Sequence, residues 1–537
     1  MKMNNKLLTL VTLLAFNITG CSDYLEETNP SEVTTEFLYT TEAGLKNAVT
    51  GLYALERDQV DDSESTYFAL IQGDGGTDID FIRAAVSSNV ARYRLDVDLA
   101  GEAAIRSWWR KWYTIIERTN SIITYGSAAD IPQESKALFL REAYVHRANA
   151  YFWLIRKYDN IWLNTEPTTY ENVSNREYGV ATIEEVYDLI ISDLDLAISY
   201  YGNDWSAIAG QFGLGAALFL RTNVALWQGD WATAGDLAER IINEGTYALV
   251  EPSDIFTKDG RNSSRETIYA LQLDEFAIGG GNAHRFPLTF TTQYRKVPGM
   301  VNVAEFGGYG WGRISPNEYL LSLYNPDFDK RWDAWFQHYY TYNDQSYDFS
   351  SLPYKLGDTL VANQNSSLTP SNFYANACVS VKKYFDFQKD PEVRISYNNV
   401  IMYRFAEVYL MAAEAFFKDG QTDKAVYYFN LLRLNRIRPG APGRVKFTIT
   451  TNDILEEYAR ELAFEGRRWF ILKRFGVLVD RVRLYGGQSS FRGIPSPSPD
   501  YYSARTNIQD YHVRWPIPQS ELDAMGGIFP QNEGYVQ

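Results

Sequence analysis

The sequence is poor in the residue types from which most metal and nucleophile sites are built. Of its 537 residues, only two are cysteine and four are histidine. No histidine lies near another histidine or near a cysteine at the spacing that zinc ligands need. The histidines are His146, His284, His338 and His512. We therefore expect neither a metal ion nor another cofactor.

Positive charge is scarce relative to negative charge. The chain has 51 lysines and arginines against 67 aspartates and glutamates, which gives a formal net charge of −16. Nucleic acids and anionic lipid surfaces attract proteins that present a basic face, so this balance argues against both as partners. A common nucleophile motif and a common phosphate-binding motif are also missing. The sequence has no Gly-x-Ser-x-Gly, and the glycine-rich run 307–312 lacks the Gly-x-Gly-x-x-Gly spacing.

Aromatic residues, by contrast, are abundant. They make up 15% of the chain, with 39 tyrosines and 13 tryptophans, which exceeds what core packing usually demands. Two interpretations are open. Either the helices pack through many rings, or some rings lie on the surface, where flat side chains stack on sugars or peptides.

The N-terminus has the composition of an export signal. Lys2 and Lys6 precede an apolar run, residues 7–18, which is too short to span a bilayer. The run leads into Ile18-Thr19-Gly20-Cys21, which resembles the bacterial lipobox. We therefore predict that residues 1–20 are a lipoprotein signal peptide.

In this interpretation Cys21 becomes the lipidated first residue of the mature chain. Its sulfur is then used in a thioether, so Cys378 is the sole free thiol and no intrachain disulfide forms. No other run is long and apolar enough to span a membrane. The sequence thus predicts a protein that is anchored to a membrane by lipid rather than one that crosses it.

Helical periodicity dominates both ends of the chain. Apolar residues recur every three or four positions in segments that predict helices, namely 41–55, 107–125, 138–158, 182–198, 213–227, 232–242, 401–417, 425–438 and 454–475. Glycine turns at Gly229 and Gly420 separate neighbouring helices. We therefore expect antiparallel helix pairs of about the size of a tetratricopeptide unit, without the strict period of a plain solenoid.

Several charged residues in the C-terminal helices are predicted to be exposed. Arg404 and Glu407 are three positions apart, and we interpret them as a surface ion pair rather than a catalytic pair. Further charge pairs are expected on the exposed side of segment 454–475, among Arg460, Glu461, Glu465, Arg467 and Arg468.

Residues 251–400 have a different character, and we call them the insertion. Helical periodicity weakens here, glycine, asparagine, serine, proline and tyrosine become frequent, and only 266–272 suggests a short strand. The polar stretch 339–380 is longer than most structureless loops, which usually carry function at that length. Because binding residues tend to lie on loops held by a rigid scaffold, we place the ligand on the insertion.

A set of motifs, in order along nearly the whole chain, resembles the SusD/RagB family of surface nutrient-binding lipoproteins. After the lipobox, they are Trp112-Tyr113 with Asn120, the run from Arg147 to Tyr158, Arg404-Phe-Ala-Glu407 with Leu410 to Ala415, the run from Arg460 to Trp469, Trp515-Pro-Ile-Pro518, and Gln531-Asn532 with Gly534-Tyr535. Each motif is loose, but their order and spacing together are specific.

The resemblance implies a mostly α, SusD-like fold in which tetratricopeptide-like helix pairs form the scaffold and an irregular, aromatic-rich loop insertion is added. The helical regions are then 21–245 and 401–537. The resemblance also implies a lipid-anchored protein on the outer face of the outer membrane, without catalytic activity. It would bind a glycan and act with a TonB-dependent, SusC-like transporter, closing over the transporter's barrel as a lid.

The chemistry of sugars suggests which residues of the insertion bind the glycan. Sugar rings offer apolar C–H faces and a rim of hydroxyls, so a site needs aromatic platforms and a few polar groups. We predict Tyr294, Tyr309 and Trp311 as platforms, with Trp332 behind them.

Polar contacts are predicted from the loop 72–80, since the family has a comparable glycine- and aspartate-rich loop near its ligand face. The candidates are Asp74, Asp78 and Arg83. A calcium site is the alternative for this loop, but the spacing of its aspartates does not match the Asp-x-Asp-x-Asp-Gly pattern.

Three other functions are left open by the sequence. The family includes peptide importers, so the same lid architecture with an oligopeptide as ligand is one alternative. A helical-repeat adaptor without a small ligand is the second, although the export signal and the aromatic insertion argue against it. A glycoside hydrolase needs two carboxylates at a set separation, which 67 acidic residues do not exclude, but no motif supports one.

Overall fold

The computed structural model of this chain describes residues 35–60, 74–82, 89–94, 103–174, 177–206, 208–276, 283–362, 376–487 and 503–535. The predicted signal peptide, Cys21 and Arg83 lie outside the described residues. The described part is mostly helical, which confirms the predicted fold class. None of its helices combines the length and the apolar composition needed to cross a bilayer.

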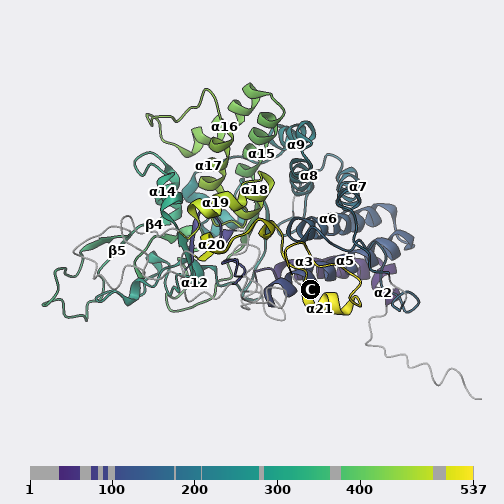
Figure 1. The fold of residues 1–537 in the computed structure, drawn as a ribbon, viewed down its shortest axis with the longest axis horizontal. Coiled ribbons are helices and arrows are strands. Elements are labelled where there is room, and N and C mark those ends of the chain that lie inside the picture. Colours follow the sequence, from purple (N-terminus) through teal and green to yellow (C-terminus); the bar gives the residue numbers. More distant parts are fainter. Residues whose placement is uncertain are drawn as a thin grey trace, which may run out of the picture.

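Long helices form the N-terminal region, on the right in Figure 1. They are α2 (Thr35–Thr40), α3 (Glu42–Arg57), α5 (Ala103–Ala128), α6 (Gln133–Tyr158), α7 (Ile183–Tyr201), α8 (Leu214–Gln228) and α9 (Trp231–Glu244). Local signals set their ends. Thr182 and Glu185 form a capping box at the start of α7, and Gly229, at a φ of 75°, ends α8 in the left-handed conformation.

Consecutive helices pack side by side and form one continuous array. Contacts join α5 to α6, α6 to α7, α7 to α8, and α8 to α9. The array continues with helices that follow the insertion in the sequence. Helix α9 packs against α15 (Phe405–Lys418), and α15 packs against α16 (Thr422–Arg436). Helices that are neighbours in the sequence therefore pack together, as the prediction of helix pairs requires, and two helices far along the sequence extend the array of the first half.

A short antiparallel ladder closes the base of the insertion. Strand β2 (Thr267–Leu271) pairs with β8 (Val400–Arg404), with Thr267 opposite Arg404 and Leu271 opposite Val400. The predicted strand at 266–272 is confirmed, but the predicted helix 401–417 begins four residues late, at Phe405. All five residues of β8 are buried, and a short apolar run buried on both faces looks the same in a sequence whether it is helix or strand.

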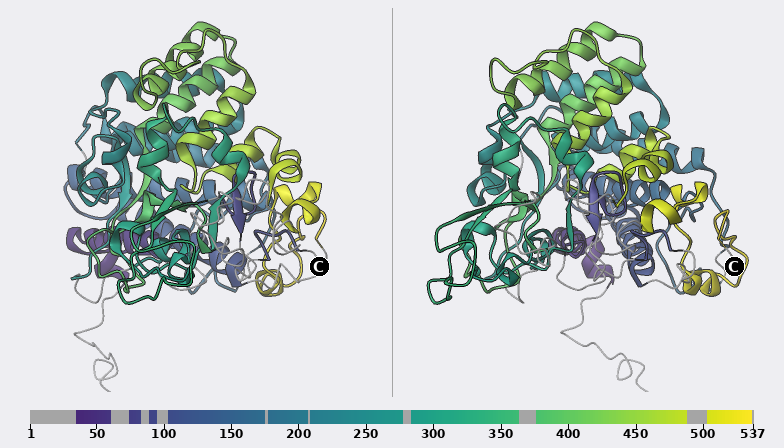
Figure 2. Two further views of the ribbon diagram at one scale, coloured as in Figure 1. Left: turned by 90° about the vertical axis from the view of Figure 1, so that its left-hand side faces the viewer. Right: turned by 60° about the vertical axis from the view of Figure 1, so that its left-hand side comes forward.

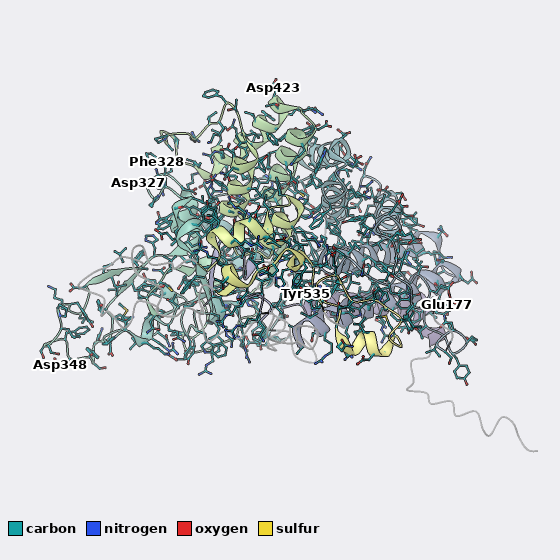
Figure 3. All side chains as sticks on the ribbon, in the orientation of Figure 1. Glu177, Asp327, Phe328, Asp348, Asp423 and Tyr535 are labelled. Atoms are coloured by element: carbon teal, nitrogen blue, oxygen red, sulfur yellow. The ribbon has the colours of Figure 1, made fainter. Side chains whose placement is uncertain are left out.

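The insertion itself projects away from the helical array, toward the left in Figure 1 and the lower left in the right-hand view of Figure 2. Figure 3 labels Asp348 near its tip and Glu177 at the opposite side of the molecule. Its helices are short: α10 (Pro252–Ile255), α11 (Lys258–Ser263), α12 (Phe286–Phe290), η3 (Tyr294–Lys296), η4 (Ala304–Phe306), α13 (Glu318–Ser322), α14 (Lys330–Trp335) and η6 (Lys382–Tyr384).

Two-residue and three-residue strands tie the loops of the insertion together. Strand β4 (Phe336–Gln337) pairs with β7 (Ser380–Val381), and β5 (Tyr339–Thr341) pairs with β6 (Thr359–Val361). In a third pair, β1 (Asp80–Ile82) pairs with β3 (Ile314–Pro316) and joins the glycine- and aspartate-rich loop of the N-terminal region to the insertion.

The C-terminal elements are α17 (Thr451–Leu462), α18 (Arg468–Arg474), α19 (Leu478–Tyr485), α20 (Ser503–Asn507), η8 (Asp510–Val513) and α21 (Gln519–Ala524). The single helix predicted over 454–475 is therefore two helices. Phe464 and Gly466 have φ values of 63° and 76°, which end α17 and turn the chain before α18 begins.

One hydrophobic core runs through the whole array, and aromatic rings fill much of it. The rings of Trp112 and Trp153 stack with their centroids 5.7 Å apart, and those of Phe219 and Tyr403 with their centroids 4.5 Å apart. Many of the aromatic residues therefore pack helices together. The aromatic residues of the insertion are the remaining candidates for ligand-binding platforms on the surface.

Candidate functional site

The aspartates predicted as polar ligand contacts are buried and have partners within the protein. Asp74 accepts hydrogen bonds from the backbone N–H groups of Gly466 and Arg468, the latter at 3.0 Å. Asp78 accepts two bonds of 2.7 Å from the guanidinium of Arg468 and one of 3.0 Å from Arg481. Both carboxylates therefore hold the start of α18 and face away from solvent.

The two carboxyl groups differ in pKa. Burial raises the pKa of Asp74 to about 7, although the N–H groups of Gly466 and Arg468 act in the opposite direction. Burial alone would raise the pKa of Asp78 as well, but the adjacent charges of Arg468 and Arg481 bring it below its ordinary value. The bonds from Asp74 also explain the broken helix, because they bind the backbone of the turn between α17 and α18.

Tyr294 is a core residue of the insertion. Its side chain is 1% exposed, and its ring stacks on that of Tyr340 with the centroids 5.1 Å apart. Its hydroxyl accepts from the Val303 N–H at 2.8 Å and donates to the Val303 carbonyl at 3.2 Å. Tyr294 thus supports the loop beneath the surface, and no sugar ring reaches it in this conformation.

Tyr309 and Trp311 are half-buried and sit on a rigid backbone frame. The Tyr309 N–H donates to the Pro391 carbonyl, and the Trp311 N–H donates to the Leu288 carbonyl, both at 2.7 Å. Between them, Gly310 lies so close to the main chain that a Cβ would overlap the carbonyl oxygen of Thr291. The two rings are therefore held in place by backbone contacts from two other segments of the insertion.

Three arginines stack on these two rings. The guanidinium carbons of Arg295 and Arg394 lie 3.8 and 4.4 Å from the Tyr309 ring centroid. The guanidinium carbon of Arg313 lies 4.3 Å from the Trp311 ring centroid. We call these five residues the arginine–aromatic patch.

Sequence reasoning identified the rings of this patch but missed its arginines. Arg313 is two positions from Trp311, and Arg295 follows Tyr294 directly, so a search for cations next to the predicted platforms would have found both. Arg394 comes from a segment some 80 positions further along, and only the folded chain brings it to Tyr309.

Trp332 belongs to a second set of rings. It is half-buried at α14, its ring centroid lies 5.1 Å from that of His338, and the His338 ring lies 5.4 Å from that of Tyr339. Tyr339 is 40% exposed. We call Trp332, His338 and Tyr339 the aromatic row. The Asp333 carboxylate lies 3.1 Å from Nε2 of His338 and gives the row a polar edge.

Among the surface hollows of the described residues, two larger ones lie away from the predicted residues. One, of about 520 Å³, is lined by Phe256, Lys330 and Phe387 among others. The other, of about 600 Å³, lies between α5 and α21, and its lining includes Tyr113 and Trp162, whose rings stack with their centroids 6.3 Å apart. Neither hollow includes a residue of the patch.

The charged residues that were predicted on the C-terminal surface are buried, so that prediction is wrong. Arg404 bonds to Glu465 at 2.7 Å, to Glu266 at 2.6 Å and to Glu461 at 3.0 Å. Arg404 lies at the end of β8, where the ladder faces α17 rather than solvent.

Further arginines extend this cluster. Arg436 of α16 bonds to Glu266 at 2.5 Å and to Glu461 at 2.9 Å, and Arg331 of α14 bonds to Glu461 at 2.9 Å. We call Arg331, Arg404, Arg436, Glu266, Glu461 and Glu465 the buried ion network. It joins the base of the insertion to the C-terminal helices.

Glu407, the other member of the predicted surface pair, is buried too. Its carboxylate bonds to Nε of Arg467 at 3.2 Å. Arg404 and Glu407 therefore do not pair with each other as predicted. Arg404 pairs with Glu266, Glu461 and Glu465, and Glu407 pairs with Arg467. Across the described ranges, no group of three histidine, cysteine or acidic side chains is placed to hold a metal ion.

Comparison with known proteins gives consistent matches. A sequence model described as the SusD family matches residues 265–535, and a second, described as "Starch-binding associating with outer membrane", matches residues 23–221. A SusD-like protein of Formosa agariphila is 24% identical over 568 aligned residues, covering 97% of each chain.

Solved structures resemble this chain over almost its whole length. A SusD homolog from Bacteroides thetaiotaomicron has a TM-score of 0.72 at 19% identity, covering 94% of this chain and 99% of its own. Surface glycan-binding protein A from the same organism, in complex with laminarihexaose, has a TM-score of 0.68 at 20% identity, covering 92% of this chain and 100% of its own. At these identities the likeness establishes the fold.

Proposed function

This chain belongs to the SusD family, and we propose that it is a surface lipoprotein that binds a glycan and delivers it to a TonB-dependent transporter of the outer membrane. Proteins of this family are not catalytic, so the chain is not an enzyme, and a solved relative of the same fold is described as a surface glycan-binding protein. The second family description supports association with the outer membrane. The complex of a relative of the same fold with laminarihexaose supports an oligosaccharide as the class of ligand.

The arginine–aromatic patch is the observation that favours a binding site on the insertion. Its two rings and three guanidinium groups are partly exposed, and backbone hydrogen bonds fix Tyr309 and Trp311 before any ligand arrives. Prior fixation lowers the entropy cost of binding. The aromatic row is a second surface on the same insertion where a long glycan chain would find a further contact.

The first test is a binding screen on the chain without residues 1–21. Affinity electrophoresis and calorimetry would compare plant, host and microbial polysaccharides with a mixture of oligopeptides. Retardation by a polysaccharide class supports the proposal. Heat from peptides together with no response to any glycan would contradict it and favour the oligopeptide importer.

The site is tested by the double variant Tyr309→Ala/Trp311→Ala. We expect it to lose most of the glycan affinity while its far-ultraviolet circular dichroism spectrum is unchanged. Unchanged affinity would remove the patch from the glycan site and leave the aromatic row or the hollow beside Trp162 to be examined.

Anchoring and delivery need a separate test in cells. We expect Cys21→Ala to abolish fatty-acid labelling and to release the protein from the outer-membrane fraction. We also expect a TonB-dependent transporter to copurify with the wild-type chain after mild detergent extraction. A labelled Cys21→Ala protein would contradict the lipidation site, and purification without a transporter would contradict the delivery step.

A further inference from the structure

We propose that the glycan bound at the arginine–aromatic patch is acidic, a polysaccharide that carries carboxylate or sulfate groups. This inference rests on the proposed glycan-binding function and adds the charge of the ligand to it. It follows from how the patch differs from an ordinary sugar platform.

The arginines occupy space that a sugar ring would need. The guanidinium carbons of Arg295 and Arg394 lie within 4.4 Å of the Tyr309 ring centroid and cover that ring. The guanidinium carbon of Arg313, at 4.3 Å from the ring centroid, covers Trp311 in the same way. A neutral sugar that stacked on Tyr309 would have to displace Arg295 or Arg394. The rings therefore serve as supports for the cations rather than as open platforms.

A guanidinium that stacks on a ring keeps its charge and its hydrogen-bond donors. The five N–H groups lie in the guanidinium plane, so contact through the flat face leaves the edges available. Arg295 uses one of them, from Nη1 to the Gly310 carbonyl at 3.1 Å, and this bond orients the rest. Such edges match the paired oxygens of a carboxylate or sulfate.

Arg295 and Arg394 contact aromatic rings and not carboxylates. In the described part of the chain, neither side chain forms an ion pair with a carboxylate, and Arg394 is exposed. The acidic residue nearest to Arg394 in sequence, Glu392, accepts a bond of 2.7 Å from the Asn302 side-chain amide. The patch is thus a local concentration of positive charge on a chain whose net charge is −16.

The overall negative charge makes this local arrangement informative. Long-range repulsion would discourage a polyanion from binding anywhere on the surface without a specific site. Two arginines held on one tyrosine ring also repel each other, and the ring offsets only part of that cost. An anionic ligand would relieve the repulsion, whereas a neutral glycan would leave it in place.

The experiment compares matched ligands that differ only in charge. A uronate-rich polysaccharide is paired with its carboxyl-reduced form, a sulfated polysaccharide with its desulfated form, and laminarin serves as a neutral reference. We expect the chain without residues 1–21 to bind at least one acidic form about tenfold or more tightly than its neutral partner. Retention of the uronate alone identifies the carboxylate, and retention of the sulfated form alone identifies the sulfate.

Variants connect that preference to the patch. We expect Arg295→Gln/Arg394→Gln to reduce the preference for the acidic form at least about tenfold. The matched control is Arg240→Gln/Arg483→Gln, which removes two charges that are paired with Glu244 and Asp510 outside the insertion. The control should bind as the wild type does. Thermal unfolding of both double variants would verify that they remain folded.

The outcomes separate this inference from the function on which it rests. Equal affinity for charged and neutral forms, or an unchanged preference in Arg295→Gln/Arg394→Gln, would overturn the acidic ligand and leave glycan binding intact. Failure to bind any polysaccharide would overturn both.

Discussion

Two groups of arginines in this molecule contrast sharply. In the buried ion network, Arg331, Arg404 and Arg436 are almost fully enclosed, and each bonds to two or more carboxylates. In the arginine–aromatic patch, the half-buried Arg295 and the exposed Arg394 lie against one tyrosine ring, with no carboxylate partner among the described residues.

The difference separates arginines that hold the fold from arginines that are available to a ligand. The guanidinium groups of the buried ion network are compensated by carboxylates, because an uncompensated charge in the interior is costly. A surface guanidinium supported by a ring keeps both its hydration and its donors. The partner of each arginine, and not its number along the chain, therefore indicates its role, and the following predictions test that distinction.

The largest effect is expected from Glu461→Gln in the buried ion network. Glu461 bonds to Arg331, Arg404 and Arg436, so its removal leaves three buried cations short of a partner. We expect a loss of about 3–5 kcal/mol in the free energy of unfolding, measured by urea denaturation.

The control for this prediction is Glu251→Gln. Glu251 is 54% exposed and pairs with Lys330 at 2.8 Å, so its loss should cost less than about 1 kcal/mol. Similar losses for the two variants would show that the network contributes no more than a surface pair.

The cost of Glu461→Gln should depend on pH. Burial alone would raise the pKa of Glu461, but Arg436, Arg404 and Arg331 lower it far below its ordinary value of 4.5. Its stabilising contribution is therefore complete above that ordinary value and is lost as the pH falls below it. Urea denaturation at pH 7, 5.5 and 4 should show equal costs at the first two and a smaller cost at pH 4. A cost that grows toward pH 4 would contradict the lowered pKa.

The substitution Arg394→Glu would place a carboxylate beside Arg295 in the arginine–aromatic patch, as carboxylates lie beside the arginines of the buried ion network. The new carboxylate would pair with Arg295 and repel an anionic ligand, so we expect affinity for the acidic glycan to fall about 100-fold. The free energy of unfolding should change little, since Arg394 is exposed. Calorimetric titration gives the affinity, and a normal affinity would argue that the arginines of the patch do not contact the ligand.

Trp311→Ala should have a smaller effect on affinity, about tenfold, because it removes the ring beneath Arg313 but keeps the guanidinium. The matched variant is Trp332→Ala, a tryptophan of the same insertion that lies in the aromatic row. Affinity electrophoresis compares the two. If Trp332→Ala alone weakened binding, the aromatic row would be the primary contact.

The helices could be predicted from the sequence because their signals are local. The capping box at Thr182, the glycine that ends α8 and the three- and four-residue apolar spacing act within one or two turns. The start of α15 and the break between α17 and α18 could not. They depend on β2, about 130 positions before β8, and on Asp74, almost 400 positions before Gly466.

The sequence predicted the segment that carries the candidate site, but it did not predict the role of each residue in that segment. Tyr294 and Tyr309 are both tyrosines in a glycine-rich stretch, and only the folded chain shows that one is in the core and the other on the surface. The prediction that Arg404 and Glu461 are exposed is wrong for the same reason. Charge on a helix suggests solvent until a second element with the opposite charge packs against it.

Arginine-specific footprinting with phenylglyoxal, read by mass spectrometry with and without an acidic polysaccharide, tests the distinction between the two settings most directly. We predict that Arg295 and Arg394 are modified in the free protein and protected by the ligand, while Arg331, Arg404 and Arg436 stay unmodified in both samples. Equal modification of Arg295 and Arg394 with and without a bound polysaccharide would contradict the assignment of these arginines to the ligand.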